Sequence, residues 1–450
     1  MKLPNLLATR KGRLFAFFAL YVTEGIPLGF AAVAIATQMR RQGLGPAAIG
    51  AFVASLYLPW AFKWVVGPIV DTIYSDRLGR RRMWIVFTQV MMIATLMIAL
   101  PVNFTTGLKL FTAIILVHNI FGATQDVAID ALAVNVLAEN ERGVANGLMF
   151  AGAYLGQAIG GSGVLFLAPY IGFNNTFFFV AAAIACVTFF VALPLREQRG
   201  PPRPPTEKSR LAEVGGDITN FVKGAAKAFV GSRGAFVALI FGILPTGAMG
   251  LGLALQANLA VELGLDDHAV AQLNLWATVI TALGCVAGGW FSDRFGRRKM
   301  LALFTASMSL PTIYLAVAMQ HAGWIHSIDP NLPNRPTPAA TLVLTFWAAT
   351  LVYGLFQGLM YGIRTALYMD VTDPKVAATQ FTAYMAILNA VIAYSAQWQG
   401  VAIERWGYPV TLAIDATVGV VSLALLPLIA PRKTPSHVPG AASVPDAVQP

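Results

Sequence analysis

Long apolar runs alternate with short polar segments along the chain. Twelve runs reach the length of about 20 residues that a helix needs to cross the ~30 Å hydrocarbon core of a bilayer. They occupy residues 14–36, 47–70, 83–101, 110–133, 143–169, 175–195, 234–260, 269–291, 300–320, 340–363, 376–401 and 409–430. Because a backbone inside a bilayer must satisfy its own hydrogen bonds, each run is predicted to be an α-helix. The pattern predicts an all-α membrane protein with twelve transmembrane helices.

The runs divide into two sets of six, which predicts two pseudo-symmetric six-helix bundles at residues 14–195 and 234–430. Residues 196–233 are the long internal hydrophilic stretch and are expected to form a cytoplasmic linker. Residues 1–13 are interpreted as a cytoplasmic N-terminus. Residues 431–450 are rich in Pro, Ala and Val without periodicity, so we expect a disordered cytoplasmic tail.

The linker has two parts. It opens with Arg199-Gly-Pro-Pro-Arg203-Pro-Pro, a stiff piece that does not form a helix. From Leu211 to Val230 the apolar residues recur at helical spacing, which predicts a helix lying along the inner membrane surface.

Composition agrees with this class. The chain has 57% hydrophobic and 12% charged residues and a mean hydropathy of +0.65, as is typical of membrane proteins. With the N-terminus inside, 25 of the 31 basic residues fall on cytoplasmic segments and five on outer loops, while Lys63 lies within a span. This asymmetry follows the positive-inside rule and predicts that both termini are cytoplasmic. The net charge of +10 is thus explained by membrane loops, and we expect no nucleic-acid partner.

One charged motif occurs twice, after the second run and after the eighth. The first copy carries Gly67, Asp71, Asp76, Arg77, Gly79, Arg80 and Arg81, and the second carries Gly289, Asp293, Arg294, Gly296, Arg297 and Arg298. The copies end at Arg82 and Lys299, which are 217 residues apart, close to half the chain. We expect these two loops to latch the inner gate between the halves.

A second repeated feature lies in the first and seventh runs. Pro27 is flanked by glycines. Pro245, which lies 218 residues further along the chain, is followed by glycines. Interrupted helices at equivalent positions of two repeats are typical of transporter binding sites, because loosened backbone is tolerated where it lines a cavity. We therefore predict helix breaks at Pro27 and Pro245.

Small residues recur at helical spacing in two other runs. They are Gly143, Gly147, Gly152, Gly156 and Gly160 in the fifth run, and Gly284 and Gly288 in the eighth. Small residues let membrane helices approach closely. We expect these glycines at the sliding surfaces between the halves.

Among the ionisable residues within or at the end of the predicted helices, five stand out: Glu24, Lys63, Asp126, Asp130 and Arg364. A charge at the bilayer centre costs roughly 2.5–3.5 kcal/mol, so each needs a partner or a function. Asp126 and Asp130 are four residues apart and share one helical face, where two like charges favour reversible proton binding. Glu24 directly precedes the Gly-x-Pro sequence. We expect Glu24, Asp126 and Asp130 to carry proton coupling, and Lys63 and Arg364 to contact substrate.

These residues have structural alternatives. Asp130 lies near the inner end of its helix, where the arginines of the first motif are also within reach. Lys63 is expected to pair either with the carboxylates of the fourth run or with an anionic substrate. Arg364 either binds a substrate carboxylate or phosphate or extends to the cytoplasm. A protonated Glu24 is also able to hydrogen-bond a neighbouring helix.

Amide side chains, notably Gln125 and Gln157, add candidate substrate contacts. No set of residues predicts catalysis. The five histidines form neither a His-x(4)-Asp motif nor a metal-ligand pair on one helix, and no Walker loop is present. We expect a protein that is not an enzyme and that uses no metal or cofactor.

Several stretches resemble known families. The two charged motifs resemble the signature loop of the major facilitator superfamily. The stretches Tyr21-Val-Thr-Glu-Gly-Ile-Pro-Leu-Gly, Phe62-Lys63-Trp-Val-Val-Gly-Pro and Ala123-Thr-Gln125-Asp126-Val-Ala-Ile-Asp130 resemble AmpG-like permeases and acetyl-CoA transporters. The resemblance implies a two-bundle transporter fold and places Lys63, Gln125, Asp126 and Asp130 at motif positions. AmpG-like permeases import anhydro-muropeptides across the bacterial inner membrane with protons, and their eukaryotic relatives move acetyl-CoA.

The sequence therefore predicts a secondary active transporter working by alternating access: a proton-coupled importer of a sizeable polar or anionic metabolite of the anhydro-muropeptide type. Its expected energy source is the proton gradient, and its expected partners are a small-molecule substrate and the lipid bilayer. We expect a monomer in the bacterial inner membrane. The alternatives are a proton/drug antiporter, a siderophore or acyl-CoA transporter, and a membrane enzyme or sensor without transport.

Overall fold

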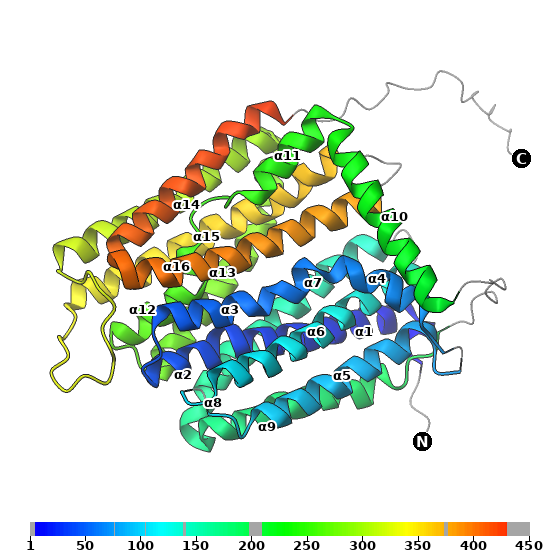
Figure 1. Ribbon diagram of the computed structural model, residues 1–450, viewed down its shortest axis with the longest axis horizontal. Coiled ribbons are helices and arrows are strands. Elements are labelled where there is room, and N and C mark those ends of the chain that lie inside the picture. The colour runs from blue at the N-terminus through cyan, green and yellow to red at the C-terminus, as the bar shows by residue number, and fades with distance from the viewer. Residues whose placement is uncertain are drawn as a thin grey trace, which may run out of the picture.

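The computed structural model describes residues 5–75, 77–103, 105–137, 141–197, 209–372 and 377–429, and every regular element in these ranges is helical (Figure 1). The elements up to η5, here called the N half, are η1 (Leu6–Ala8), α1 (Arg10–Gly29), η2 (Phe30–Ile35), α2 (Ala36–Arg41), α3 (Pro46–Ala61), α4 (Lys63–Thr72), α5 (Arg80–Ala99), α6 (Leu108–Val136), α7 (Arg142–Ala158), η4 (Ile159–Gly163), α8 (Val164–Ile171), α9 (Phe173–Val187) and η5 (Thr188–Ala192). After α10 (Arg210–Val230) comes the C half, with α11 (Arg233–Ile243), η6 (Gly250–Gly252), α12 (Ala254–Glu262), α13 (Asp267–Phe295), α14 (Arg297–His321), α15 (Ala340–Val371), α16 (Ala377–Val421) and η8 (Ser422–Leu428). The predicted tail at 431–450 lies outside the described residues.

The helices account for the twelve predicted spans. Within the described ranges, nine helical segments are long and apolar enough to cross a membrane, or eleven when two bent pairs are included. The longest segment, Gln380–Leu428, reverses direction at Gly407, where φ is 81°, and so supplies two spans (Figure 1). In the bent pair Arg210–Ile243, we assign α11 to the seventh span and leave α10 outside it. Helix α12 forms the second part of that span. The all-α, twelve-span prediction is confirmed.

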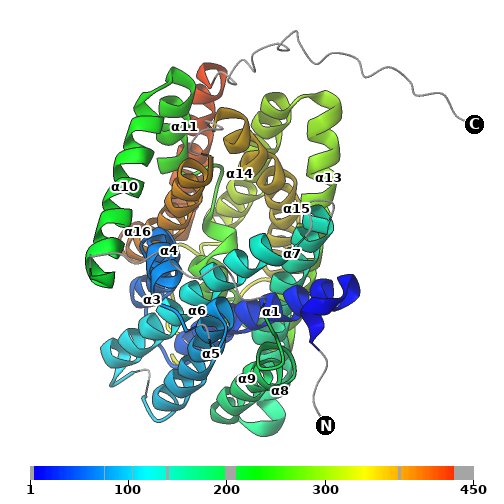
Figure 2. The same cartoon turned by 90° about the vertical axis from the view of Figure 1, so that its right-hand side faces the viewer.

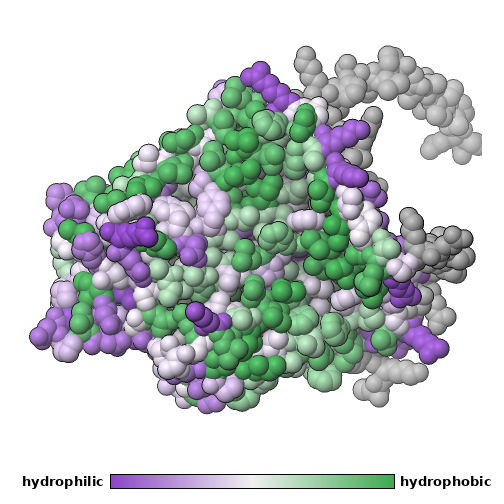
Figure 3. Space-filling view, viewed as in Figure 1, coloured by the Kyte–Doolittle hydropathy of each residue, from purple (hydrophilic) through white to green (hydrophobic). Residues whose placement is uncertain are grey.

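The two halves lie side by side, and the polar residues mark the two ends of the bundle. Figure 1 shows the N half below the C half, with α10 on the right. Hydrophobic residues cover the middle of the molecule in Figure 3, and hydrophilic residues gather at its left and right ends. We call the right-hand end, which carries α10 and both charged motifs, the terminal end. The opposite end, with the loops at 42–45, 263–266 and 322–339, is the far end.

The glycines of the fifth and eighth runs pack inside their own halves. A Cβ atom at Gly156 of α7 would lie 2.4 Å from the carbonyl oxygen of Val22 on α1. In the C half, a Cβ at Gly288 of α13 would lie 2.2 Å from the carbonyl oxygen of Leu359 on α15. The expectation that these glycines form sliding surfaces between the halves is wrong. Gly152, Gly156 and Gly160 instead join their helix to α1, and Gly284 and Gly288 join α13 to α15, as close backbone packing does in membranes.

The predicted helix breaks differ between the halves. At Pro245 the prediction is correct: α11 ends at Ile243, and the chain is non-helical until η6. At Pro27 it is wrong, because α1 continues through the proline to Gly29 and passes directly into the π-helical turn η2. Proline removes only the one hydrogen bond back to the carbonyl group four residues earlier, and the helix continues past it, so the first span stays continuous.

Helix α10 contacts both halves at the terminal end. Its Phe221 stacks on Trp64 of α4, with ring centroids 5.4 Å apart. Its Phe229 meets Tyr384 of α16 edge-on at 5.0 Å. The helix begins one residue before the predicted range and carries charged residues on its exposed face. It therefore spans the gap between the halves at the end where the motif loops lie (Figure 2).

The α1–α7 contact gives a first test. We expect Gly156→Ala to lower the free energy of unfolding by about 1–3 kcal/mol, the usual cost of overpacking, because the added methyl group meets α1 backbone. Gly147→Ala on the same helix is the matched control, since no atom lies within 4 Å of its Cβ position. Thermal unfolding of both variants in detergent measures the difference. Equal melting temperatures would contradict the packing described here.

Candidate functional site

A cavity lies between the two halves and has two adjoining lobes. The lobes share Tyr57, Tyr154, Gln157, Tyr353 and Gln357, with the first three from the N half and the last two from the C half. The larger lobe, of about 330 Å³, adds Tyr21, Glu24, Thr246 and Arg364, and we call it the charged lobe. The smaller, of about 170 Å³, adds Ser162, Gln256, Asn274, Thr278 and Thr350, and we call it the amide lobe. Both halves thus build one site with a charged part and a neutral polar part.

Several buried polar atoms around the cavity have no hydrogen-bond partner among the described residues. They are Glu24 Oε2, Thr246 Oγ1, Gln256 Nε2, Thr350 Oγ1 and Arg364 Nε. Buried polar groups in proteins are normally paired, because an unpaired one costs about 1–3 kcal/mol. Residues on the cavity wall thus keep polar atoms that the described part of the protein leaves unpaired.

Arg364 is the cation of the cavity. It lies on α15, is buried, and forms part of the wall of the charged lobe. Its guanidinium carbon is 4.8 Å from the ring centroid of Tyr361, a distance at which a cation–π interaction orients the group. Of the two alternatives for Arg364, the structure shows the one in which the side chain faces the cavity.

A cluster of charged residues adjoins the charged lobe within the N half. Lys63 Nζ is 2.9 Å from Asp126 Oδ2. The hydroxyl of Tyr21 donates to Asp130 Oδ1 at 2.5 Å and lies 3.4 Å from Asp126 Oδ1. Both aspartates share one face of α6, as their spacing predicts. Lys63 therefore pairs with a carboxylate of the fourth span, one of its two predicted partners.

The cluster reaches the cavity through α1. Tyr21 and Glu24 both line the charged lobe, and Tyr21 binds Asp130 directly. Lys63 stands at the 44° bend between α3 and α4, which turns its side chain to α6. The carboxylates of α6 are therefore connected to the cavity wall through Tyr21.

The two predicted amide contacts have different positions. Gln157 lines both lobes of the cavity. Gln125 is fully buried and lies outside the lining of either lobe; it donates to Thr23 Oγ1 at 3.2 Å, which also accepts from Gln89. Gln125 thus joins α6 to α1 and α5, so the structure places only Gln157 within reach of a ligand.

The first charged motif folds on itself. Arg81 pairs with Asp71 and donates to the carbonyl oxygen of Val70 at 2.8 Å. Glu197, beyond the sixth span, accepts from the backbone N–H groups of Arg81 and Arg82 at 2.9 and 2.5 Å and so caps the start of α5. The predicted alternative of a latch between these arginines and Asp130 is replaced by the Arg81–Asp71 pair.

The second motif repeats the backbone of the first. Gly79 and Gly296 precede α5 and α14 with φ of 91° and 92°, a conformation that favours glycine. Arg297 pairs with Asp370 at the terminal end of α15. The motif residues Arg77, Arg80, Arg294 and Arg298 also lie at this end. Asp76 and the side chain of Asp293 lie outside the described part of the chain.

The first glycine of each motif faces open space. No atom lies within 4 Å of a Cβ built at Gly67 or Gly289. Nearer the far end, where α3 of the N half meets α16 of the C half, a Cβ at Gly50 would lie 2.5 Å from the carbonyl oxygen of Ala396. The halves are thus packed tightly towards the far end, while the motif glycines touch nothing.

Ion pairs close the far end between the halves, and sequence reasoning missed them. Arg40 on α2 lies 2.5 Å from Glu262 Oε1 on α12, and both are buried. Glu262 also accepts from Tyr408 and Ser327 at 2.6 and 2.8 Å. Arg41 pairs with Asp267 at 2.6 Å nearby. A signal was present: Arg40 and Glu262 are residues of opposite charge shortly after the first and seventh predicted runs, 222 residues apart.

Comparisons with known proteins agree on the kind of molecule. The family model of the Major Facilitator Superfamily matches residues 14–396 and 237–449. The chain is 23% identical over 408 residues to the anhydromuropeptide permease of Escherichia coli, covering 90% of this chain and 77% of the permease. Its fold is similar to the solved nucleoside transporter NupG (TM-score 0.65, 16% identity, 94% and 99% of the two chains) and D-xylose–proton symporter (0.67, 12%, 92% and 97%).

The far-end pairs give a second test. Arg40→Ala leaves the buried carboxylate of Glu262 without its cation, so we expect a loss of about 3–5 kcal/mol of unfolding free energy. Arg41→Ala breaks a pair whose side chains are 28% and 20% exposed, and we expect a loss below about 1 kcal/mol. Denaturation of the purified variants measures both. Similar losses for the two would show that the Arg40–Glu262 pair is not the stronger contact.

Proposed function

Because the chain belongs to the Major Facilitator Superfamily, we propose that this membrane transporter is a proton-coupled importer of a sizeable anionic metabolite of the anhydromuropeptide type. The matched relatives and structural neighbours are transporters, and the protein is not an enzyme. The observation that carries the proposal is the charged lobe, where Glu24 and Arg364 face one cavity from opposite halves and Tyr21 joins it to the carboxylate cluster.

The two lobes support the substrate class. Arg364 offers a guanidinium fork to a carboxylate, the geometry that arginine binds best. The amide lobe offers Gln157, Gln256 and Asn274 to hydroxyl and amide groups, which sugars and peptides carry. The likeness to the E. coli anhydromuropeptide permease points to the same combination of groups.

Proton coupling rests on the cluster beside the cavity. Three carboxyl groups, at Glu24, Asp126 and Asp130, share one cation, Lys63, and one phenol, Tyr21. Because a buried charge without a partner is costly, the cluster gains a proton at one state of the cycle and releases it at another. We assign the proton to Glu24 and Asp126, with Lys63 holding Asp126 when it is ionised. The proton gradient then supplies the energy.

Alternating access follows from the contrast between the two ends. We propose that the terminal end faces the cytoplasm, since its loops carry most of the basic residues. The structure, closed at the far end by Arg40 and Glu262, then represents an inward-facing state of a monomer in the bacterial inner membrane. In the opposite state the two charged motifs latch the cytoplasmic gate.

The coupling site gives a third prediction. In proteoliposomes with an imposed inward proton gradient, labelled anhydromuropeptide uptake by the wild type should be stimulated. Asp126→Asn should lose this stimulation, because the amide takes up no proton and leaves Lys63 unpaired. Asp217→Asn on the exposed face of α10 makes the same chemical change and should behave as wild type. Folded wild-type protein without uptake under either condition would remove this substrate, and efflux against the gradient would reverse the direction.

The substrate anion gives a fourth prediction. Arg364→Gln should raise the KM for anhydromuropeptide at least tenfold, because a charge-assisted hydrogen bond contributes about 1.5–3 kcal/mol. Arg210→Gln, an exposed arginine of α10, is the control. A substrate analogue with amidated carboxylates should bind wild type more weakly and lose little further in the Arg364 variant. Additive losses would show that Arg364 does not bind the carboxylate.

A further inference from the structure

The seventh span contains a stretch of backbone that cannot satisfy its own hydrogen bonds. Between α11 and η6 the chain is non-helical, with Leu244 extended (φ −85°, ψ 148°) and Gly247 at φ 83°. Inside a membrane protein such backbone needs partners from neighbouring helices. We call residues 244–249 the break.

Asp415 supplies these partners from the twelfth span. Its Oδ2 accepts hydrogen bonds from the backbone N–H groups of Met249 and Gly250, at 2.8 Å each. Its Oδ1 accepts from Gln399 Nε2 at 2.9 Å. The side chain is 1% exposed. Each carboxylate oxygen therefore faces N–H donors, and two of the three donors belong to the residues that restart the helix.

Other contacts hold the break against the same neighbours. The N–H of Gly247 donates to the carbonyl oxygen of Gly419, one turn beyond Asp415, at 3.3 Å. A Cβ at Gly419 would lie 2.2 Å from the carbonyl carbon of Gly247, so the two backbones are in direct contact. On the other side, the hydroxyl of Tyr394 donates to the carbonyl oxygen of Ile243 at 2.6 Å.

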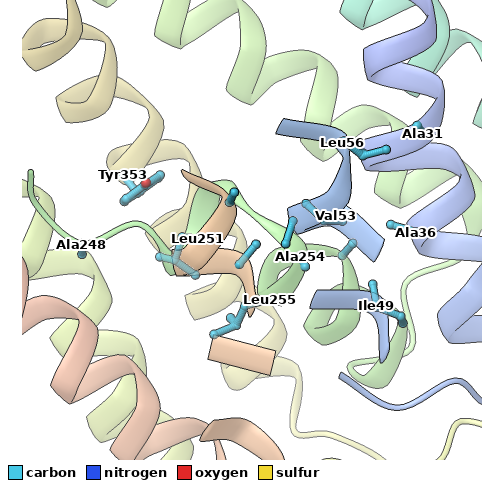
Figure 4. Close-up of a cluster of buried hydrophobic side chains, with 14 of the residues drawn as sticks. Ala31, Ala36, Ile49, Val53, Leu56, Ala248, Leu251, Ala254, Leu255 and Tyr353 are labelled. Atoms are coloured by element: carbon cyan, nitrogen blue, oxygen red, sulfur yellow. The ribbon is translucent and has the colours of Figure 1, made fainter. Parts of the chain in front are cut away.

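The break and the turn after it form part of the cavity wall. Thr246 and Met249 line the charged lobe, and Gly252 and Leu253 line both lobes. Figure 4 shows Ala248 on the thin, non-helical chain that leads to Leu251, near Tyr353. The position of this wall is thus set by what holds the break.

We propose that Asp415 is a positioning residue for the cavity: its carboxylate replaces the missing helical acceptors of the break and fixes Thr246 and Met249 where substrate binds. This assignment rests on the proposed transport function. It is a role for acceptor oxygens and needs no proton to be exchanged. The N half has no counterpart, because its first span is continuous at Pro27.

The test compares two substitutions at one position. Asp415→Asn keeps an oxygen that accepts from Met249 and Gly250, and Gln399 can present its own oxygen to the new amide group. Asp415→Leu has similar bulk but leaves both N–H groups without a partner. For anhydromuropeptide transport we expect the Leu variant to raise KM roughly tenfold or more, with a smaller change in kcat. The Asn variant should stay near the wild-type KM and keep its stimulation by the proton gradient.

A second readout follows the break itself, without substrate. After Cys186→Ala and Cys285→Ala, a Thr246→Cys probe is labelled with a membrane-impermeant maleimide. Asp415→Leu should change its labelling rate several-fold, whereas Asp415→Asn should not. Ala153→Cys on the opposite wall is the control and should label equally in all backgrounds. Should the Leu variant fail to fold, Tyr394→Phe removes one hydrogen bond of the break and should shift the labelling in the same direction.

The outcomes separate this inference from the proposed function. Unchanged Thr246→Cys labelling and unchanged KM in a folded Leu variant would overturn the positioning role. Loss of gradient-driven uptake in the Asn variant, with exchange retained, would make Asp415 a proton carrier and also overturn it. Absence of wild-type transport counts against the proposed function, while the labelling rates still decide whether Asp415 holds the break.

Discussion

A polar group inside a bilayer has no water to bind, so it must find a partner within the protein. This constraint explains most of the buried polar contacts. Lys63 meets Asp126 inside the N half, Arg40 meets Glu262 between the halves, and Asp415 meets the open backbone of the seventh span. Against that background the unpaired atoms of Glu24 and Arg364 stand out, because both residues line the cavity. At the candidate site, the protein itself does not supply a hydrogen-bond partner for every buried polar atom.

The two halves contribute different chemistry to one cavity. The N half supplies the carboxylates and Lys63, held by the spacing of α6 and the bend before α4. The C half supplies Arg364 and the broken seventh span. In the proposed mechanism, proton binding and anion binding therefore occur on facing walls. A movement of one half against the other changes the separation of these walls, which is how a proton on one side can alter affinity on the other.

Features that depend on local pattern were predictable, and features that depend on a distant partner were not. Apolar run length gave the spans, and the repeat of the charged motif was visible in the sequence, although the matching conformations of Gly79 and Gly296 came from the structure. The spacing of Asp126 and Asp130 gave their shared face. Glycine spacing, however, defines a face without naming what packs on it, so the glycines of α7 were assigned to the wrong interface. Gln125 was assigned to the substrate because its partner Thr23 is distant in the sequence, and Pro27 was predicted to break a helix that continues to Gly29.

The glycines of the interface have a consequence for mutational tolerance. A methyl group at Gly50 or Gly400 would meet facing backbone between the halves, whereas one at Gly67 or Gly289 meets nothing within 4 Å. In this state Gly50 and Gly400 have no room for a larger side chain, whereas Gly67 and Gly289 do. Under the proposed alternating access, we expect the contacts at Gly50 and Gly400 to open and those at Gly67 and Gly289 to close in the opposite state. If glycine substitutions are scored by transport rate, the result at each glycine reflects the conformation in which that glycine is packed most closely. The contacts of a single conformation therefore explain only some of the sensitive positions.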